Sequence, residues 1–311
     1  MGRKILKLAL LIHEKAPFSH KNVYDALVEC FQKTDNDLIV LTIESYIKNP
    51  ESVDWIFLID HYQIRQHYTK FKTKYNTKVA IWILEDTYEI DATTNIDLNV
   101  DIVFTNDAGS IRTRMQCGQN VYLLPLACRK SIFYPNRKEI VNELIFVGNA
   151  FINRIHFVHA LQPFLENTNI HLNIYGINWE KGKFKSPYIH ITNSIISEQQ
   201  LAELYNTSET ALEINRGLHN QNKNAVTAIT PSRGFNSLAC ACHTITDRRE
   251  TTNEYFPNDC ISLCDSIDDI KWQIMLNKNK KKEMAEKGQQ HVLSKHTYEH
   301  RVETILNTLR G

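Results

Sequence analysis

The sequence predicts an α/β protein built from two doubly wound, parallel-sheet domains in tandem. Short apolar runs alternate with amphipathic stretches of helical length along the whole chain. The alternation is interrupted once, near the middle of the chain, and then restarts. The 311 residues exceed what one hydrophobic core usually holds, which fits two domains.

The first half predicts six strands, at residues 6–12, 37–43, 53–59, 79–84, 102–105 and 121–124. Amphipathic stretches between several of them predict helices at 21–33, 63–75 and 108–117. The segment 129–141 contains Tyr134-Pro135-Asn136-Arg137, which follows neither periodicity. We interpret it as a linker and predict an N-terminal domain at 1–135.

The second half repeats the strand and helix pattern without repeating the sequence. Strands are predicted at 144–148, 171–175, 189–192, 211–215, 243–246 and 261–263, and helices at 154–165, 198–205, 232–242 and 268–276. Residues 280–309 read as helical apart from a break near 294–297. We predict a C-terminal domain at 136–295, with 296–311 as a separate terminal helix.

The composition excludes several classes of partner. The net charge of +1 gives no electrostatic reason to expect nucleic acid or an anionic membrane as partner. No stretch approaches the roughly 18 apolar residues of a membrane span. Lys7 interrupts the apolar N-terminal run, which therefore predicts a first strand rather than a signal peptide. We expect a cytoplasmic protein without a transmembrane segment.

The seven cysteines do not form a disulfide framework, because their number is odd and they are scattered through a long chain. Cys240-x-Cys242-His243 and Cys260-x3-Cys264 raise the hypothesis of a zinc site. This spacing fits no common zinc module. Buried thiols are the favoured interpretation, and we expect no metal.

Polar residues that follow the predicted strands mark the candidate site, because ligands of doubly wound sheets bind at the carboxyl ends of the strands. In the first half these residues are acids, amides and histidines, notably His13, Glu85 and Asp86. In the second half they include glycines, asparagines and arginines: Gly148, Asn149, Asn153, Arg154, Tyr175, Gly176, Asn215 and Arg216. This asymmetry predicts a phosphorylated ligand in the second domain and activation of a second substrate by the first.

A helix is predicted to begin at residues 230–234. Thr230 suits the cap, Pro231 the first helical position, and Ser232, Arg233 and Gly234 complete the first turn. The N–H groups of a helix N-terminus favour an anion such as a diphosphate, and Arg233 adds a forked cation. An ordinary capped helix with a surface arginine is the alternative interpretation.

Several segments resemble one family when they are taken in order. They are Val147-Gly148-x4-Asn153-Arg154, Ile174-Tyr175-Gly176-x2-Trp179, Leu212-x-Ile214-Asn215-Arg216, Thr230-Pro-Ser-Arg233-Gly-Phe235 and His296-Thr297-Tyr298-x2-Arg301. Together with Trp82-x2-Glu85-Asp86 upstream, they resemble the CgeB-like, spore-maturation type of group 1 glycosyltransferases. The resemblance covers most of residues 53–309.

The resemblance implies a fold of the GT-B type, with two Rossmann-like domains facing a central cleft. It implies transfer of a hexosyl group from a nucleotide-sugar, with UDP as the expected nucleotide, to a hydroxyl of a glycan, protein or small molecule. No metal or other cofactor is implied beyond the nucleotide-sugar co-substrate. The helix at 296–311 is expected to cross back onto the N-terminal domain.

The resemblance also suggests roles for individual residues. Arg233 and Arg154 are the first and second candidates to bind the donor diphosphate. Ile195 and Ile196, before the helix predicted from 198, either offer backbone groups to the nucleotide base or serve in hydrophobic packing. Asp86, with Glu85, is ranked first as the general base and His13 second. Asn236 stands where the family usually has a glutamate that holds the donor ribose, which puts donor choice and activity in question.

Two other functions remain open from the sequence. One is a nucleotide-sugar-binding protein without catalytic activity, which the neutral Asn236 suggests. The other is a two-lobed protein that binds a small ligand.

Overall fold

The computed structural model describes residues 5–60, 71, 74–86, 88, 90–91, 100–136, 138–217 and 232–311. Its contacts divide the chain into two compact units. The first holds the described residues up to Leu126 together with Tyr298–Gly311, and the second holds Ala127–Gly217 together with residues 232–297. The sequence places the boundary at 135/136 and the start of the terminal segment at 296.

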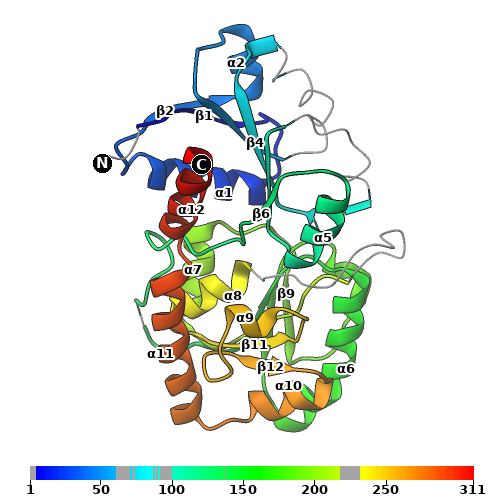
Figure 1. Cartoon of the computed structure of the whole chain (residues 1–311). Coiled ribbons are helices and arrows are strands. Elements are labelled where there is room, and N and C mark those ends of the chain that lie inside the picture. Colours follow the sequence, from blue (N-terminus) through cyan, green and yellow to red (C-terminus); the bar gives the residue numbers. More distant parts are fainter. Residues whose placement is uncertain are drawn as a thin grey trace. The chain divides into compact units, whose positions relative to one another are not determined.

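The first unit is a parallel sheet of six strands in the order β2-β1-β3-β4-β5-β6 (Figure 1). The strands are β1 (Lys7–Ile12), β2 (Asp37–Thr42), β3 (Trp55–Ile59), β4 (Lys78–Ile83), β5 (Ile102–Thr105) and β6 (Val121–Leu123). The helices described here are α1 (Phe18–Phe31), α2 (Ile43–Lys48), α5 (Ala108–Gln116) and α12 (Tyr298–Arg310). Most of the helix predicted at 63–75 lies outside the described residues.

The central strands of this sheet are apolar on both faces, as expected where helices cover both. One face packs Leu11, Leu58 and Ile81 against Ile43 and Tyr46 of α2. Side chains alternate between faces along a strand, so the intervening residues of β1, β3 and β4 point to the opposite side. Every residue of β3 is buried, although the strand is only five residues long.

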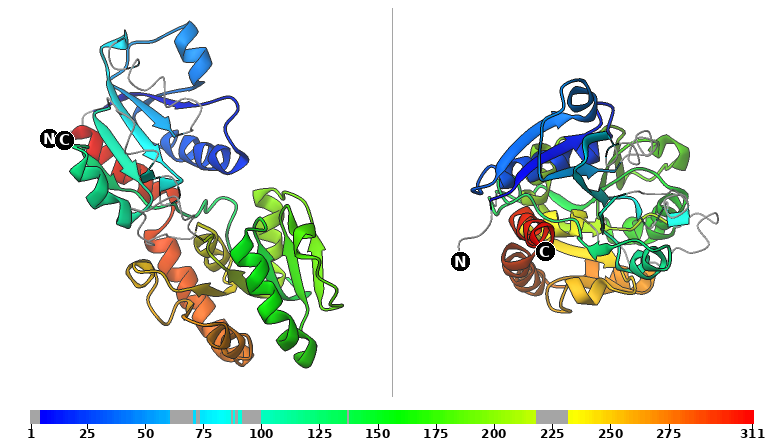
Figure 2. Two further views of the ribbon diagram at one scale, coloured as in Figure 1. Left: turned by 90° about the vertical axis from the view of Figure 1, so that its right-hand side faces the viewer. Right: turned by 45° about the horizontal axis from the view of Figure 1, so that its top comes forward.

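The last helix of the chain is part of this first unit. Helix α12 packs against α1, and the C-terminus lies beside the unit in Figures 1 and 2. The indole of Trp55 donates to the carbonyl of Leu309 at 3.1 Å. The guanidinium of Arg301 donates to the carbonyls of Pro125 and Leu126 at 2.7 and 3.1 Å. A chain end without such contacts usually frays.

The second unit repeats the architecture with strand order β12-β11-β10-β7-β8-β9, again all parallel. Its strands are β7 (Asn142–Val147), β8 (Leu172–Tyr175), β9 (Ile189–Thr192), β10 (Ser208–Glu213), β11 (His243–Asp247) and β12 (Ser262–Cys264). Its helices are α6 (Ile152–Thr168), α7 (Glu198–Asn206), α8 (Ser232–Ala239), α9 (Thr252–Tyr255), α10 (Ile267–Ile274) and α11 (Lys278–Lys295), with a short 3-10 helix at Trp179–Gly182.

Helices cover both faces of the second sheet. The core on one side joins Phe146 and Leu212 of the sheet to Val158 of α6 and Ile270 of α10. Helices α7, α8 and α11 pack against strands β10 and β11 and against one another. The predicted fold class, α/β with two doubly wound parallel sheets, is confirmed.

Strand β10 runs two to three residues earlier than the sequence predicts, over Ser208–Glu213 instead of 211–215. The polar residues at the start of β10 hide the strand pattern in the sequence. The fold accommodates them because each has a polar partner. The hydroxyl of Ser208 donates to the carbonyl of Leu204 at 2.6 Å, and that of Thr210 lies 3.2 Å from Nδ1 of His243.

The cysteines of the zinc hypothesis are buried thiols. All seven cysteines are free, and Cys240, Cys242, Cys260 and Cys264 are buried. Among the described residues, no group of three or more histidine, cysteine, aspartate or glutamate side chains is arranged to hold a metal ion. The predicted burial of these four cysteines is confirmed.

His243, at the start of β11, is 1 % exposed, with Nδ1 near Thr210 and Nε2 3.0 Å from the hydroxyl of Ser262. Burial, reinforced by the charge of Lys281, lowers the pKa of His243 to about 3. The unfolded chain takes up a proton near pH 6.5, whereas the folded state stays neutral. Stability should therefore fall as the pH drops from about 6.5 towards 3, by at most about 5 kcal/mol from this group.

We predict that His243→Gln, which cannot be protonated, reduces this loss of stability at acidic pH. The substitution should also lower stability near neutral pH. Urea unfolding between about pH 4 and 7 measures the effect. His156→Gln, at an exposed position of α6, is the matched control. An unchanged slope in the His243 variant would contradict the assignment.

Candidate functional site

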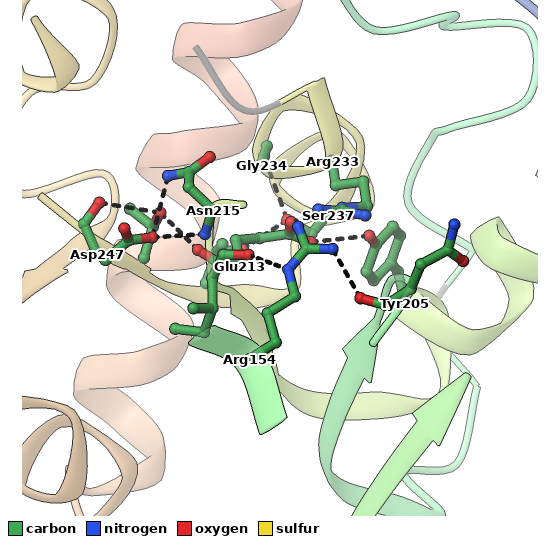
Figure 3. A network of polar contacts seen from close by, with 12 residues as sticks. Arg154, Tyr205, Glu213, Asn215, Arg233, Gly234, Ser237 and Asp247 are labelled. Atoms are coloured by element: carbon green, nitrogen blue, oxygen red, sulfur yellow. Dashed lines mark hydrogen bonds and ion pairs between the residues drawn. The ribbon is translucent and has the colours of Figure 1, made fainter. Parts of the chain in front are cut away.

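The predicted site residues of the second half gather at the carboxyl ends of β7 and β10, which are parallel neighbours (Figure 3). Gly148 and Asn149 follow β7 and lead into α6, which carries Arg154 in its first turn. Glu213 ends β10, and Arg233 is the second residue of α8. All of these residues belong to the second unit.

Arg154 is 4 % exposed, and its guanidinium is fixed from several sides. Its Nε donates to the carbonyl of Ile214 at 2.9 Å, and one terminal nitrogen donates to the carbonyl of Asn149 at 3.0 Å. The group also lies over the rings of Phe146 and Phe151, at 5.6 and 5.2 Å from their centroids. Arg154 is a preorganised cation rather than a flexible surface side chain.

The guanidinium of Arg233 is held by a buried carboxylate. Its Nε donates to Oε2 of Glu213 at 3.0 Å, and the hydroxyl of Tyr205 donates to Oε1 at 3.0 Å. Glu213 is 1 % exposed. Burial raises the pKa of Glu213, although the positive charges of Arg233 and Arg154 oppose the shift. Burial and the nearby Glu213 likewise raise the pKa of Tyr205 well above its ordinary value.

The two guanidinium groups converge on the backbone of Gly148. A Cβ atom placed on Gly148 would lie 2.9 Å from one terminal nitrogen of Arg233 and 3.0 Å from one of Arg154. A residue with a side chain would therefore push against both cations. The glycine allows two positive groups, from α6 and α8, to approach the end of β7 at one point.

The backbone around Gly148 is fixed by the neighbouring strand end. The indole of Trp179 donates to the carbonyl of Gly148 at 2.7 Å, and the amide of Gly148 donates to the carbonyl of Tyr175 at 2.8 Å. Gly176 has a φ of +149°, and a Cβ there would lie 2.1 Å from the Gly148 carbonyl oxygen. Only glycine fits at 176, because both its backbone conformation and its contact exclude a side chain.

A network of amides fixes the segment that follows β10. Asn153 donates to the carbonyl of Asn215 at 2.9 Å and accepts from the amide of Gly217 at 3.0 Å. Asn215 donates twice to Oδ1 of Asp247, and the other oxygen, Oδ2, pairs with Arg249. These contacts give Asn153 and Asn215 structural tasks beside the two arginines.

Arg216 and Asn149 lie at the edge of this cluster. The guanidinium of Arg216 lies over Phe151, 4.5 Å from its centroid, so that ring contacts two arginines. Asn149 is exposed, and its Oδ1 accepts from the amide of Ile177 at 3.3 Å. Tyr175 is half-buried and precedes the turn at Gly176.

Helix α8 supplies the remaining residues of the predicted phosphate site. Ser232 begins the helix, and Gly234 is buried in its first turn. Asn236 is half-buried, and its side-chain oxygen is buried without a hydrogen-bond partner among the described residues. Thr230 and Pro231 lie outside the described residues. Ile196, which is half-buried, precedes Ser197, the capping residue of α7.

Asp86, ranked first as the base, serves as a partner of Arg114. Both side chains are fully buried, and Nε of Arg114 donates to Oδ2 of Asp86 at 2.6 Å. A second bond joins Nη2 of Arg114 to Oδ1. A carboxylate that is fully buried and paired in this way is not accessible to an acceptor hydroxyl.

His13 and Glu85 are more accessible than Asp86, since both are half-buried. His13 follows β1, and its Nε2 lies 3.0 Å from Oε1 of Glu44 in α2. Its Nδ1 accepts from the amide of Lys15 at 3.0 Å. His13 therefore forms a histidine–carboxylate pair at the carboxyl end of a central strand.

Sequence reasoning missed Glu213, Tyr205 and Asp247. Glu213 lies inside an apolar strand pattern, where a single charge carries no positional signal. Its role depends on Arg233, twenty residues later in the chain. Asp247 directly follows the strand 243–246 predicted from the sequence, so the strand-end criterion that found Asn215 would also have found it.

Comparisons with known proteins bear on both the sequence and the fold. A family model described as glycosyl transferase-like matches residues 154–307. No curated protein matches the sequence. Among the described residues, no helix is long and apolar enough to cross a membrane.

Solved structures match over nearly the full length. Sucrose-phosphate synthase from Thermosynechococcus elongatus aligns with a TM-score of 0.72 at 10 % identity, covering 98 % of each chain. HepE of Anabaena, solved in complex with UDP-glucose, gives 0.71 at 9 % identity, covering 98 % of this chain and 99 % of the other. A glycosyltransferase from Rickettsia africae gives 0.66 at 10 % identity, with 97 % and 98 % coverage.

The fold is the GT-B fold of glycosyltransferases. The family match, which begins at Arg154 and includes Arg233, supports activity as a glycosyltransferase. The finer assignment to the spore-maturation group is not part of these findings.

We predict that Gly148→Ala separates the two guanidinium groups without unfolding the protein, because the added methyl meets the ends of two side chains and no backbone atom. The affinity for UDP should fall by about tenfold or more, which titration calorimetry measures. Gly176→Ala is the contrasting variant. Its methyl meets backbone, so it should lower the melting temperature markedly. If folded Gly148→Ala binds UDP with unchanged affinity, the two guanidinium groups that converge on Gly148 do not bind the diphosphate together.

Proposed function

We propose that the protein transfers a hexosyl group from a UDP-sugar to a hydroxyl acceptor, with the donor bound by the second unit. The observation that carries this proposal is the convergence of Arg154 and Arg233 on Gly148. HepE, which shares the fold, was solved with UDP-glucose, and this supports UDP as the nucleotide. The acceptor is a hydroxyl of a glycan, a protein or a small molecule.

The chemistry of sugar transfer explains why two fixed cations are useful. The bond between the sugar and the diphosphate breaks, and negative charge develops on the leaving nucleoside diphosphate. Preorganised positive groups stabilise such charge without reorganising during the reaction. Arg154 and Arg233 are preorganised by their contacts, and the N–H groups at the start of α8 add partial positive charge.

We propose His13 as the general base in place of Asp86. Glu44 orients the ring through Nε2, so Nδ1 is the proton-accepting atom once it leaves the amide of Lys15. Glu85, beside the buried Asp86, is the second candidate.

A catalytically silent nucleotide-sugar-binding protein is the second candidate function. It is favoured by Asn236, a neutral side chain in the helix that carries Arg233. Release of UDP from a UDP-sugar by the purified protein would exclude it.

On the sequence motifs we place the enzyme in the spore-maturation group, and the seven free cysteines support a reducing compartment such as the cytoplasm.

We predict that Arg233→Ala weakens UDP binding by roughly 10- to 150-fold, because a charge-assisted hydrogen bond contributes about 1.5–3 kcal/mol. Arg233→Lys should recover part of the loss, since a point charge replaces a fork. Uridine, which has no phosphate, should bind all three proteins alike. Calorimetry with both ligands measures this.

Two controls accompany that test. Lys280→Ala removes an exposed cation paired with Glu283 and should leave UDP binding unchanged. Arg233→Ala also leaves the Glu213 carboxylate buried without its main partner. The double variant Arg233→Ala/Glu213→Gln removes this unpaired charge and should fold better than Arg233→Ala. If folded Arg233→Ala binds UDP as the wild type does, or if the double variant binds UDP as Glu213→Gln alone does, α8 is not the phosphate site.

We predict that transfer does not depend on a divalent metal, because the two arginines supply the positive charge that a metal would otherwise bring. Activity with a UDP-sugar should survive EDTA. Loss of activity in EDTA that Mg²⁺ or Mn²⁺ restores would contradict this expectation.

A further inference from the structure

Glu213 is a buried negative charge placed among the groups that are proposed to bind a diphosphate. Arg233 of α8 donates to one of its oxygens, and Tyr205 of α7 donates to the other (Figure 3). Arg154 of α6 adds a second positive charge nearby, and the Cys242 thiol before β11 contributes to the raised pKa of Tyr205. The ionised carboxylate is therefore stabilised mainly by Arg233, with smaller contributions from Tyr205 and Arg154.

A diphosphate bound to those cations changes the balance at Glu213. It brings at least two negative charges and shares the field of Arg233 and Arg154. A nearby like charge favours the neutral form of a carboxyl group, and burial acts in the same direction. Both effects act on Glu213 at the same time.

The hydrogen bonds of Glu213 survive protonation. A proton on Oε1 can be donated to the oxygen of Tyr205, whose hydroxyl donates to that atom in the ionised state. Oε2 keeps its bond from Nε of Arg233. The carboxyl group can change its charge without moving Arg233.

We propose that Glu213 positions Arg233 and takes up a proton from solvent when the donor diphosphate binds, so that donor binding is coupled to proton uptake. The proposal rests on the proposed diphosphate site. The raised pKa of Glu213 before any ligand binds agrees with it. By linkage, UDP affinity falls as the pH rises through the coupled range, by at most about tenfold per pH unit.

The test compares UDP binding by the wild type and by Glu213→Gln. The glutamine keeps the shape and both hydrogen bonds but cannot titrate. Calorimetry in two buffers of different ionisation enthalpy, from about pH 5 to 8, gives the number of protons taken up. Glu209→Gln is the matched control, since Glu209 lies on the same strand but pairs with Lys281.

The wild type should take up more protons than Glu213→Gln, by up to about one, and Glu209→Gln should match the wild type. Because UDP titrates in every protein, the difference isolates Glu213. The variant should also bind UDP more tightly than the wild type at the high end of the pH range. Equal proton uptake in a wild type and a Glu213→Gln protein that both bind UDP would overturn the proposal. A merely structural role would shift affinity equally at every pH.

Infrared difference spectra of the wild type give a second measurement, which needs no variant. Adding UDP should produce the C=O band of a protonated carboxyl group, and the absence of a new band would overturn the proposal. If the wild type binds uridine and UDP equally well, or neither, the diphosphate site itself is wrong. UDP binding without proton uptake is a different result, because it would overturn only the role of Glu213 and leave the diphosphate site in place.

Discussion

The structure of the candidate site depends on the ion pair between Arg233 and the buried Glu213. Taking a carboxylate out of water is costly unless cations and hydrogen bonds replace the lost solvation. Arg233 and Tyr205 supply those partners, and in return the carboxylate fixes the guanidinium. Arg154 is fixed in another way, by backbone carbonyls and two aromatic rings.

The two cations meet at the backbone of Gly148, where no side chain keeps them apart. The carbonyl of Gly148 is covered by Gly176 and bonded by Trp179, so the loop after β7 has little freedom. The absence of a side chain at 148 then sets how closely the two guanidinium groups approach. The carboxyl ends of parallel strands meet at one edge of a sheet. In this protein the two arginines give that edge a defined positive charge.

Much of the fold could be predicted from the sequence, because buried parallel strands and amphipathic helices leave strong periodic patterns. Gly148, Gly176, Arg154 and Arg233 could also be found, since each follows a strand or opens a helix. Glu213 could not, because its role depends on a partner twenty residues away. Asp86 looked like Glu85 in sequence. Only packing shows that Arg114 encloses it, while Glu44 orients His13.

The central claim is that Arg154 and Arg233 bind the donor diphosphate beside Gly148. A crystal structure of the protein with UDP tests it most directly. The account predicts phosphate oxygens within hydrogen-bonding distance of Arg233 and close to Arg154, with Arg233 still bonded to Glu213. A well-ordered UDP whose phosphates contact neither arginine would contradict it.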